Sequence, residues 1–146
     1  MLFRSARDVS PAEAMDLVFG YAVGIDMTRR DLQAEAKAAG RPWEAGKSFR
    51  HAAPCSALTP IADSGEINAA EISLKINGEM RQRGDVNQMI WKVPEVISRL
   101  STLFQLCPGD LIFTGTPAGV GPVLPGDHLE GHIDGLVPLS FNVRSA

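Results

Sequence analysis

The chain has 146 residues, of which 45% are hydrophobic and 6% aromatic, and its formal net charge at pH 7 is −3. One ordinary core fits this length, so we expect a single domain over residues 1–146. The sequence has no basic stripe and few aromatic stacking platforms, which argues against nucleic acid as a partner, and no apolar run approaches the roughly 20 residues of a membrane helix.

Residues 1–10 lack the apolar core of a signal peptide, so we expect a cytoplasmic protein. The two cysteines, Cys55 and Cys107, lie far apart in a chain without a secretion signal. We therefore expect reduced thiols rather than a disulfide.

The first predicted helix runs from Pro11 to about Val18. Ser10 and Glu13 have the spacing of a capping box, with proline at the first helical position. The apolar, β-prone run 19–25 follows, and we expect a buried strand that ends at Asp26.

A second helix is predicted from Arg29 to Ala39, with Thr28 as its N-cap and a stop at Gly40. Arg30 and Gln33 lie three residues apart and share its polar face. The free N–H groups at the start of a helix, together with Arg30, favour a bound carboxylate.

Residues 40–60 show no helical or strand period, so we expect a long loop that carries Lys47. The runs 71–76 and 79–83 flank Asn77-Gly78, a strong hairpin signal. A helix opening at Pro94 has an apolar stripe that we expect in the core, made of Val93, Val96, Ile97, Leu100, Leu103 and Phe104.

Three late strands are expected over residues 111–113, 128–133 and 137–143, the last two joined near Asp134-Gly135. Together these elements predict an α+β fold that is rich in β-structure and has a few peripheral helices.

Four kinds of polar group gather where the predicted strand 19–25 gives way to the next helix: the Asp26 carboxylate, the Arg30 guanidinium, the Gln33 amide and the Lys47 ammonium. Taken singly, Asp26 is a helix cap, Arg30 a solvated charge and Lys47 a loop residue. Taken together, they suit a divalent metal and a small, doubly anionic oxo acid.

The order of these residues closely resembles the fumarylacetoacetate hydrolase family. The matching motifs are Gly24-x-Asp26-x-Thr28-x-Arg30-Asp31-x-Gln33, Gly46-Lys47-Ser48-Phe49, Asn77-Gly78-Glu79 with Arg81-Gln82, Pro108-Gly109-Asp110-Leu111-Ile112, Thr114-Gly115-Thr116-Pro117-x-Gly119-Val120-Gly121, and Pro125-Gly126-Asp127. The resemblance covers the chain from about Val9 to the C-terminus. Because of residues 48–55, it is nearest to the bacterial fumarylpyruvate and acylpyruvate hydrolases.

The resemblance implies a β-rich fold of the mixed sandwich or roll type and cleavage of a carbon–carbon bond in a 1,3-dicarbonyl 2-oxo acid, with release of pyruvate. It also implies a cofactor, Mg²⁺ or else Mn²⁺ or Ca²⁺, that polarises the oxo acid. The chain would act as a homodimer on a small 2-oxo acid.

The same resemblance assigns roles residue by residue. Asp26 becomes a metal ligand, and Lys47 and Arg30 become the catalytic residues. The residues that hold substrate become Arg30, Gln33, Lys47, Thr114, Gly115 and Thr116.

The sequence departs from the family in its acidic and histidine residues. The family's Glu-x-Glu metal pair would fall before Met1, and we interpret Glu13 and Asp16 as solvated helix charges rather than ligands. None of His51, His128 and His132 matches the family's water-activating residues. The chain therefore resembles the C-terminal portion of the enzyme.

Two alternatives stay open from these departures. Besides the hydrolase, the chain would be a non-catalytic or truncated remnant of the family that retains only part of the substrate site, or a family decarboxylase or isomerase on a related oxo acid.

Overall fold

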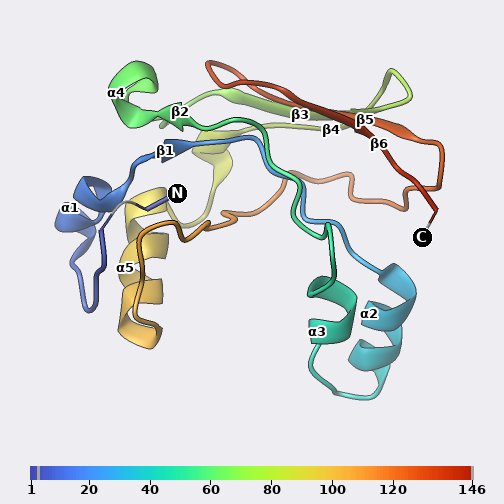
Figure 1. Ribbon diagram of the computed structural model, residues 1–146, viewed down its shortest axis with the longest axis horizontal. Helices are drawn as coiled ribbons and strands as arrows, with labels where there is room; N and C mark the ends of the chain where they lie inside the picture. Colours follow the sequence, from blue (N-terminus) through green and yellow to red (C-terminus); the bar gives the residue numbers. More distant parts are fainter. Residues whose placement is uncertain (3, 146) are drawn as a thin grey trace.

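The computed structural model describes residues 1–2 and 4–145, and it has the α+β fold that the sequence predicts. Figure 1 shows a four-stranded antiparallel sheet along one side of the molecule, with two separate groups of helices on the same side of it. One group is α1 (Pro11–Ala14) with α5 (Val93–Leu103), and the other is α2 (Arg30–Ala38) with α3 (Glu44–Lys47).

The main sheet has the strand order β4-β3-β5-β6, and its strands are β3 (Glu71–Ile76), β4 (Glu79–Asp85), β5 (His128–Ile133) and β6 (Leu139–Asn142). The predicted hairpin between β3 and β4 is confirmed. Asn77 and Gly78 have φ values of 54° and 82°, as a two-residue type I′ turn requires.

The remaining elements are short. β1 (Gly20–Tyr21) pairs with β2 (Thr59–Pro60), α4 (Ile61–Ser64) follows directly, and two 3₁₀ turns are η1 (Met15–Leu17) and η2 (Val86–Gln88). No helix in the part of the chain that the structure describes is long and apolar enough to cross a membrane.

The core lies where α1 packs against α5. Its buried side chains are Leu2, Ala6, Ala14, Leu17, Val18, Ile97 and Leu106. Ser101 is fully buried among them, and its hydroxyl is satisfied because it accepts a hydrogen bond from Val9 N at 3.0 Å and donates one to Ser98 O at 2.7 Å.

The start of α1 confirms the predicted capping residues. Glu13 accepts hydrogen bonds from the Ser10 backbone N–H at 3.1 Å and from the Ser10 hydroxyl at 2.6 Å. These bonds stabilise the charged carboxylate and lower the pKa of Glu13 below its ordinary value.

Two sequence predictions for the second half of the chain are wrong. Leu103 and Phe104 are 58% and 62% exposed, because they are the last residue and the C-cap of α5 and lie beyond its buried residue Ser101. Residues 111–113 do not form a strand, since no neighbouring strand pairs with them in the described structure.

The segment before α2 is extended, but only its first part is a regular strand. Beyond β1, Ile25 N donates to Pro54 O at 3.0 Å and Met27 N donates to Ala52 O at 2.8 Å. The prediction of a long loop over residues 40–60 is therefore wrong in part, because this region pairs with the segment before α2 and contains α3.

Asp127 ties the β3–β4 turn to the start of β5. Its carboxylate accepts hydrogen bonds from Leu124 N and from Asn77 Nδ2, each at 2.8 Å. The bond from Leu124 N is the larger cause, followed by that from Asn77, and together they lower the pKa of Asp127 below its ordinary value of 3.8.

We expect an Asp127→Asn variant to lose part of the acid dependence of stability. A lowered carboxyl pKa contributes stability that is present above pH 3.8 and is lost as the pH falls through the folded-state value. Urea unfolding at pH 6 and pH 3 measures this effect. If the wild-type protein and the variant lose equal stability between these pH values, Asp127 is not a source of that dependence.

Candidate functional site

A groove of about 640 Å³ collects most of the predicted site residues. Its polar lining comes from several separate parts of the chain, and comprises Asp26, Thr28, Arg29, Arg30, Asp31, Lys47, Ser73, Arg81, Gln82 and Thr116, with the backbone of Gly115 and Gly119. The sheet supplies an apolar floor that includes Ile72, Leu74 and Leu129.

Lys47 links two residues of the segment before α2. Its ammonium Nζ donates to Asp26 Oδ2 at 2.7 Å and to Thr28 Oγ1 at 2.9 Å. The Lys47 and Asp26 side chains are 33% and 54% exposed, so the ion pair contributes at most about 1 kcal/mol. Such a weak pair rearranges easily when a ligand arrives.

The backbone places Lys47 beside α2. Arg29 N donates to Gly46 O at 3.0 Å, and a Cβ atom at Gly46 would lie only 3.1 Å from Gln33 N. The Arg29 guanidinium also stacks over the Phe49 ring, 4.5 Å from its centroid. Glycine at position 46 therefore allows α3 to approach α2 closely.

Thr28 has a different role from the one predicted. The N-cap of α2 is Arg29, and no side chain caps this helix. Instead, the Thr28 hydroxyl accepts a hydrogen bond from Lys47. Lys47 itself lies at the last position of α3 rather than in a loop.

Arg30 lines the groove, whereas Gln33 does not. Arg30 Nη1 donates to Gln33 Oε1 at 3.2 Å. Gln33 is thus placed to orient the Arg30 guanidinium, and its direct contact with a substrate stays a prediction.

The second wall of the groove is the glycine-rich segment 115–121. Gly115 and Gly119 have φ values of 117° and 99°, which side chains rarely permit. Thr116 also lies in the groove, but Thr114 lines a separate apolar cavity of about 130 Å³ between α5 and the sheet.

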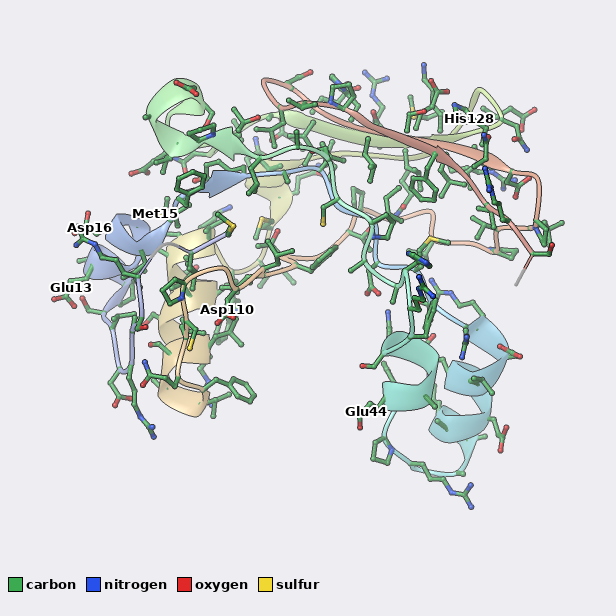
Figure 2. The ribbon with its side chains drawn as sticks, in the orientation of Figure 1. Glu13, Met15, Asp16, Glu44, Asp110 and His128 are labelled. Atoms are coloured by element: carbon green, nitrogen blue, oxygen red, sulfur yellow. The ribbon has the colours of Figure 1, made fainter. Side chains whose placement is uncertain are left out.

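No group of three or more metal-binding side chains occurs among residues 1–2 and 4–145. In Figure 2, Glu13 and Asp16 lie beside α1, on the other side of the molecule from α2 and α3. They are therefore not additional ligands for a metal at Asp26.

The histidines have ordinary structural surroundings. His128 lies between Asn142 Oδ1 at 2.9 Å and Ser140 Oγ at 3.2 Å, and His132 lies 3.1 Å from Asp134 Oδ1. His51 has a φ of 66° in an exposed turn. None of the three lines the groove.

Both cysteines are free, as predicted. Burial raises the pKa of the Cys55 thiol above its ordinary value, so this thiol is protonated at neutral pH and is a poor nucleophile.

Sequence reasoning missed the role of Gln82 in the groove. Its Nε2 donates to Thr116 Oγ1 at 2.8 Å and to Pro117 O at 2.7 Å. A polar residue four positions after the Asn77-Gly78 turn was the available signal, but the sequence alone does not reveal which distant loop it reaches.

The groove has two carboxylates and several cations on one wall and glycine backbone on the other, a combination of groups that suits a small anionic molecule. Residues 1–144 match the family model described as fumarylacetoacetate (FAA) hydrolase C-terminal. The chain belongs to the fumarylacetoacetate hydrolase family.

Individual relatives agree with this membership. The chain is 44% identical to a fumarylpyruvate hydrolase of Ralstonia sp over 94% of this chain and 71% of the relative. It is 45% identical to the mitochondrial oxaloacetate tautomerase FAHD2 of Oryza sativa subsp. japonica over 99% of this chain and 64% of the relative.

A solved structure shows the same fold. The crystal structure of fumarylpyruvate hydrolase from Pseudomonas aeruginosa, in complex with Mn²⁺ and pyruvate, is 49% identical with a TM-score of 0.96, covering 99% of this chain and 62% of that one. The chain thus spans a little under two thirds of the length of this structure and of the rice relative.

Proposed function

We propose that this chain forms one wall of the active site of a metal-dependent hydrolase, which cleaves a carbon–carbon bond in acylpyruvates such as fumarylpyruvate and releases pyruvate. The observation that carries the proposal is the Asp26–Lys47–Thr28 cluster, which shares one groove with the Gly115–Thr116 backbone. The names of the Ralstonia and Pseudomonas relatives support the same substrate class.

A divalent metal is part of the proposal, with Mg²⁺ or Mn²⁺ as the ion. Asp26 would hold it, since the Asp26 carboxylate lies in the groove and is only weakly paired. Mg²⁺ commonly takes one or two carboxylates and completes its shell with waters and substrate oxygens. The described residues fit a metal shared with substrate, and they do not fit a metal held by protein alone. When bound, the ion would polarise the 2-oxo group.

The side chains around Asp26 would bind and orient the oxo acid. Lys47 has three N–H donors and uses two of them on Asp26 and Thr28, so one is left for a substrate oxygen. Arg30 adds a fixed positive charge on the same wall. These two cations favour the carboxylate and the enolate oxygen of a departing pyruvate unit.

A second candidate function is tautomerisation of oxaloacetate. The observation that favours it is the 45% identity to the rice oxaloacetate tautomerase. This reaction needs the same recognition of a 2-oxo acid, with loss of a proton from the enol oxygen and addition of one to the neighbouring carbon, but no attacking water.

We expect the chain to release pyruvate from fumarylpyruvate when Mg²⁺ or Mn²⁺ is present, and to stop when EDTA removes the metal. A coupled lactate dehydrogenase assay measures this release, and the decay of enol-oxaloacetate absorbance measures the alternative reaction. Metal-dependent tautomerisation without pyruvate release would favour the second function. If neither reaction depends on added metal, the proposed enzyme activity of this chain is wrong.

A further inference from the structure

Gln82 joins strand β4 to the loop that forms the second wall of the groove. Its amide Nε2 donates to Thr116 Oγ1 at 2.8 Å and to Pro117 O at 2.7 Å. A backbone carbonyl only accepts hydrogen bonds, so the NH₂ end of the amide must face the loop. The orientation of the Gln82 side chain is therefore fixed by its partners.

A β-bulge in β4 lies directly beside Gln82. The register pairs Leu74 with Gln82 and Lys75 with Met80, so Arg81 is an extra residue without a partner across the strand. A bulge of this kind turns neighbouring side chains to a new direction and is frequent beside binding sites. Here the bulge lies beside Gln82, whose side chain extends from β4 and forms hydrogen bonds with the loop.

The loop is shaped to meet this strand. Gly119 has a φ of 99°, and a Cβ atom at this position would collide with the Arg81 carbonyl oxygen. A Cβ atom at Gly84 would lie 3.2 Å from Pro117 Cβ. Strand and loop thus approach each other closely on both sides of Gln82, through the Arg81 backbone on one side and the Pro117 ring on the other.

The hydrogen bond from Gln82 determines whether the Thr116 hydroxyl acts as a donor or as an acceptor toward the groove. A hydroxyl has one proton to donate, and the Thr116 oxygen already accepts from Gln82. Its own proton is left for another acceptor, and a hydroxyl that accepts one hydrogen bond donates a stronger second one. The opposite wall carries Arg30 and Lys47, so the matching ligand group is an anionic oxygen.

We infer that Gln82 is a positioning residue that fixes Thr116 as a hydrogen-bond donor to the carboxylate of the bound oxo acid. This inference rests on the proposed function, because it concerns the same groove and the same class of ligand. Gln82 acts through Thr116 and does not touch the ligand itself.

The test is pyruvate binding to the full chain in the presence of Mn²⁺, measured by isothermal titration calorimetry. We expect Gln82→Leu and Thr116→Val each to weaken binding about tenfold, which is the size of one charge-assisted hydrogen bond. The double variant should be no weaker than Thr116→Val alone, because both changes remove the same donor. Thr116→Ser keeps the hydroxyl and should bind like the wild type.

Gln105→Leu is the matched control. Gln105 also donates from Nε2 to two backbone carbonyls, those of Ala6 and Leu106, but it lies outside the groove. The Gln105→Leu variant should have a lower free energy of unfolding than the wild type and an unchanged affinity for pyruvate. If Gln82→Leu does not fold, the contrast between Thr116→Val and Thr116→Ser still tests whether the hydroxyl donates to the ligand.

The failures of the two proposals are distinguishable. A wild-type chain that does not bind pyruvate with Mn²⁺ overturns the proposed function. The role of Gln82 alone is overturned if the wild-type chain binds pyruvate and Gln82→Leu binds it with equal affinity. It is also overturned if the losses of binding free energy in the two single variants add fully in the double variant.

Discussion

Alanine at Asp26 is expected to reduce Mn²⁺ affinity at least ~100-fold, because it removes the carboxylate proposed as metal ligand. Lys47 would keep its bond to Thr28, so the backbone around the site should stay in place. Titration of Mn²⁺ followed by electron paramagnetic resonance, with pyruvate present, measures the free ion directly.

Asp31 provides the matched control for this variant. It is a second carboxylate in the same groove, in the first turn of α2, and forms no part of the Lys47 cluster. Asp31→Asn should leave Mn²⁺ affinity within about twofold of the wild type. If Asp31→Asn loses Mn²⁺ binding and Asp26→Ala retains it, the metal ligand is Asp31 and not Asp26.

Alanine at Gly119 is expected to lower the free energy of unfolding by about 3 kcal/mol. The backbone at this position has a φ of 99°, and the added methyl would collide with the Arg81 carbonyl, so either the loop or β4 must move. Because this loop is one wall of the groove, ligand binding should weaken as well. Chemical denaturation measures the change in stability.

Gly121 is the control in the same loop. Apart from its two chain neighbours, no described residue has an atom within 4 Å of a Cβ atom built there, and its φ is outside the left-handed region. Gly121→Ala should change the free energy of unfolding by less than about 1 kcal/mol. Equal destabilisation by the two substitutions would mean that the contact between Gly119 and β4 does not stabilise the loop.

The features that could be predicted from sequence are those determined by near neighbours. Ser10 and Glu13 satisfy each other across one helical turn, and Asn77-Gly78 adopts the positive φ values that its two residue types tolerate. The spacing of Arg30 and Gln33 likewise predicts that they share one face of α2, and in the structure a hydrogen bond joins the two side chains.

The features that escaped prediction depend on distant partners. Leu111 and Phe113 have strand-forming side chains, but no neighbouring strand pairs with them in the described structure. Thr114 and Thr116 are equivalent by residue type, and only the fold places Thr116 in the groove and Thr114 beside the core. Propensity is local, whereas these outcomes come from packing.

The family motifs predicted part of this long-range arrangement. They place seven residues in one site, of which Gln33 and Thr114 lie outside the groove and five line it, namely Asp26, Arg30, Lys47, Gly115 and Thr116. They could not reveal that Lys47 bonds Thr28, because Thr28 before a helix has the ordinary appearance of an N-cap.

In the proposed site, Asp26 and the Gly115–Thr116 segment hold a metal ion and a 2-oxo acid between them. Paramagnetic broadening of backbone amide signals by Mn²⁺, with and without pyruvate, measures where the ion lies. We expect broadening around Asp26 and Lys47 that extends to Gly115 and Thr116 when pyruvate is added. Broadening centred on His128 and His132, or none above that of free Mn²⁺, would contradict it.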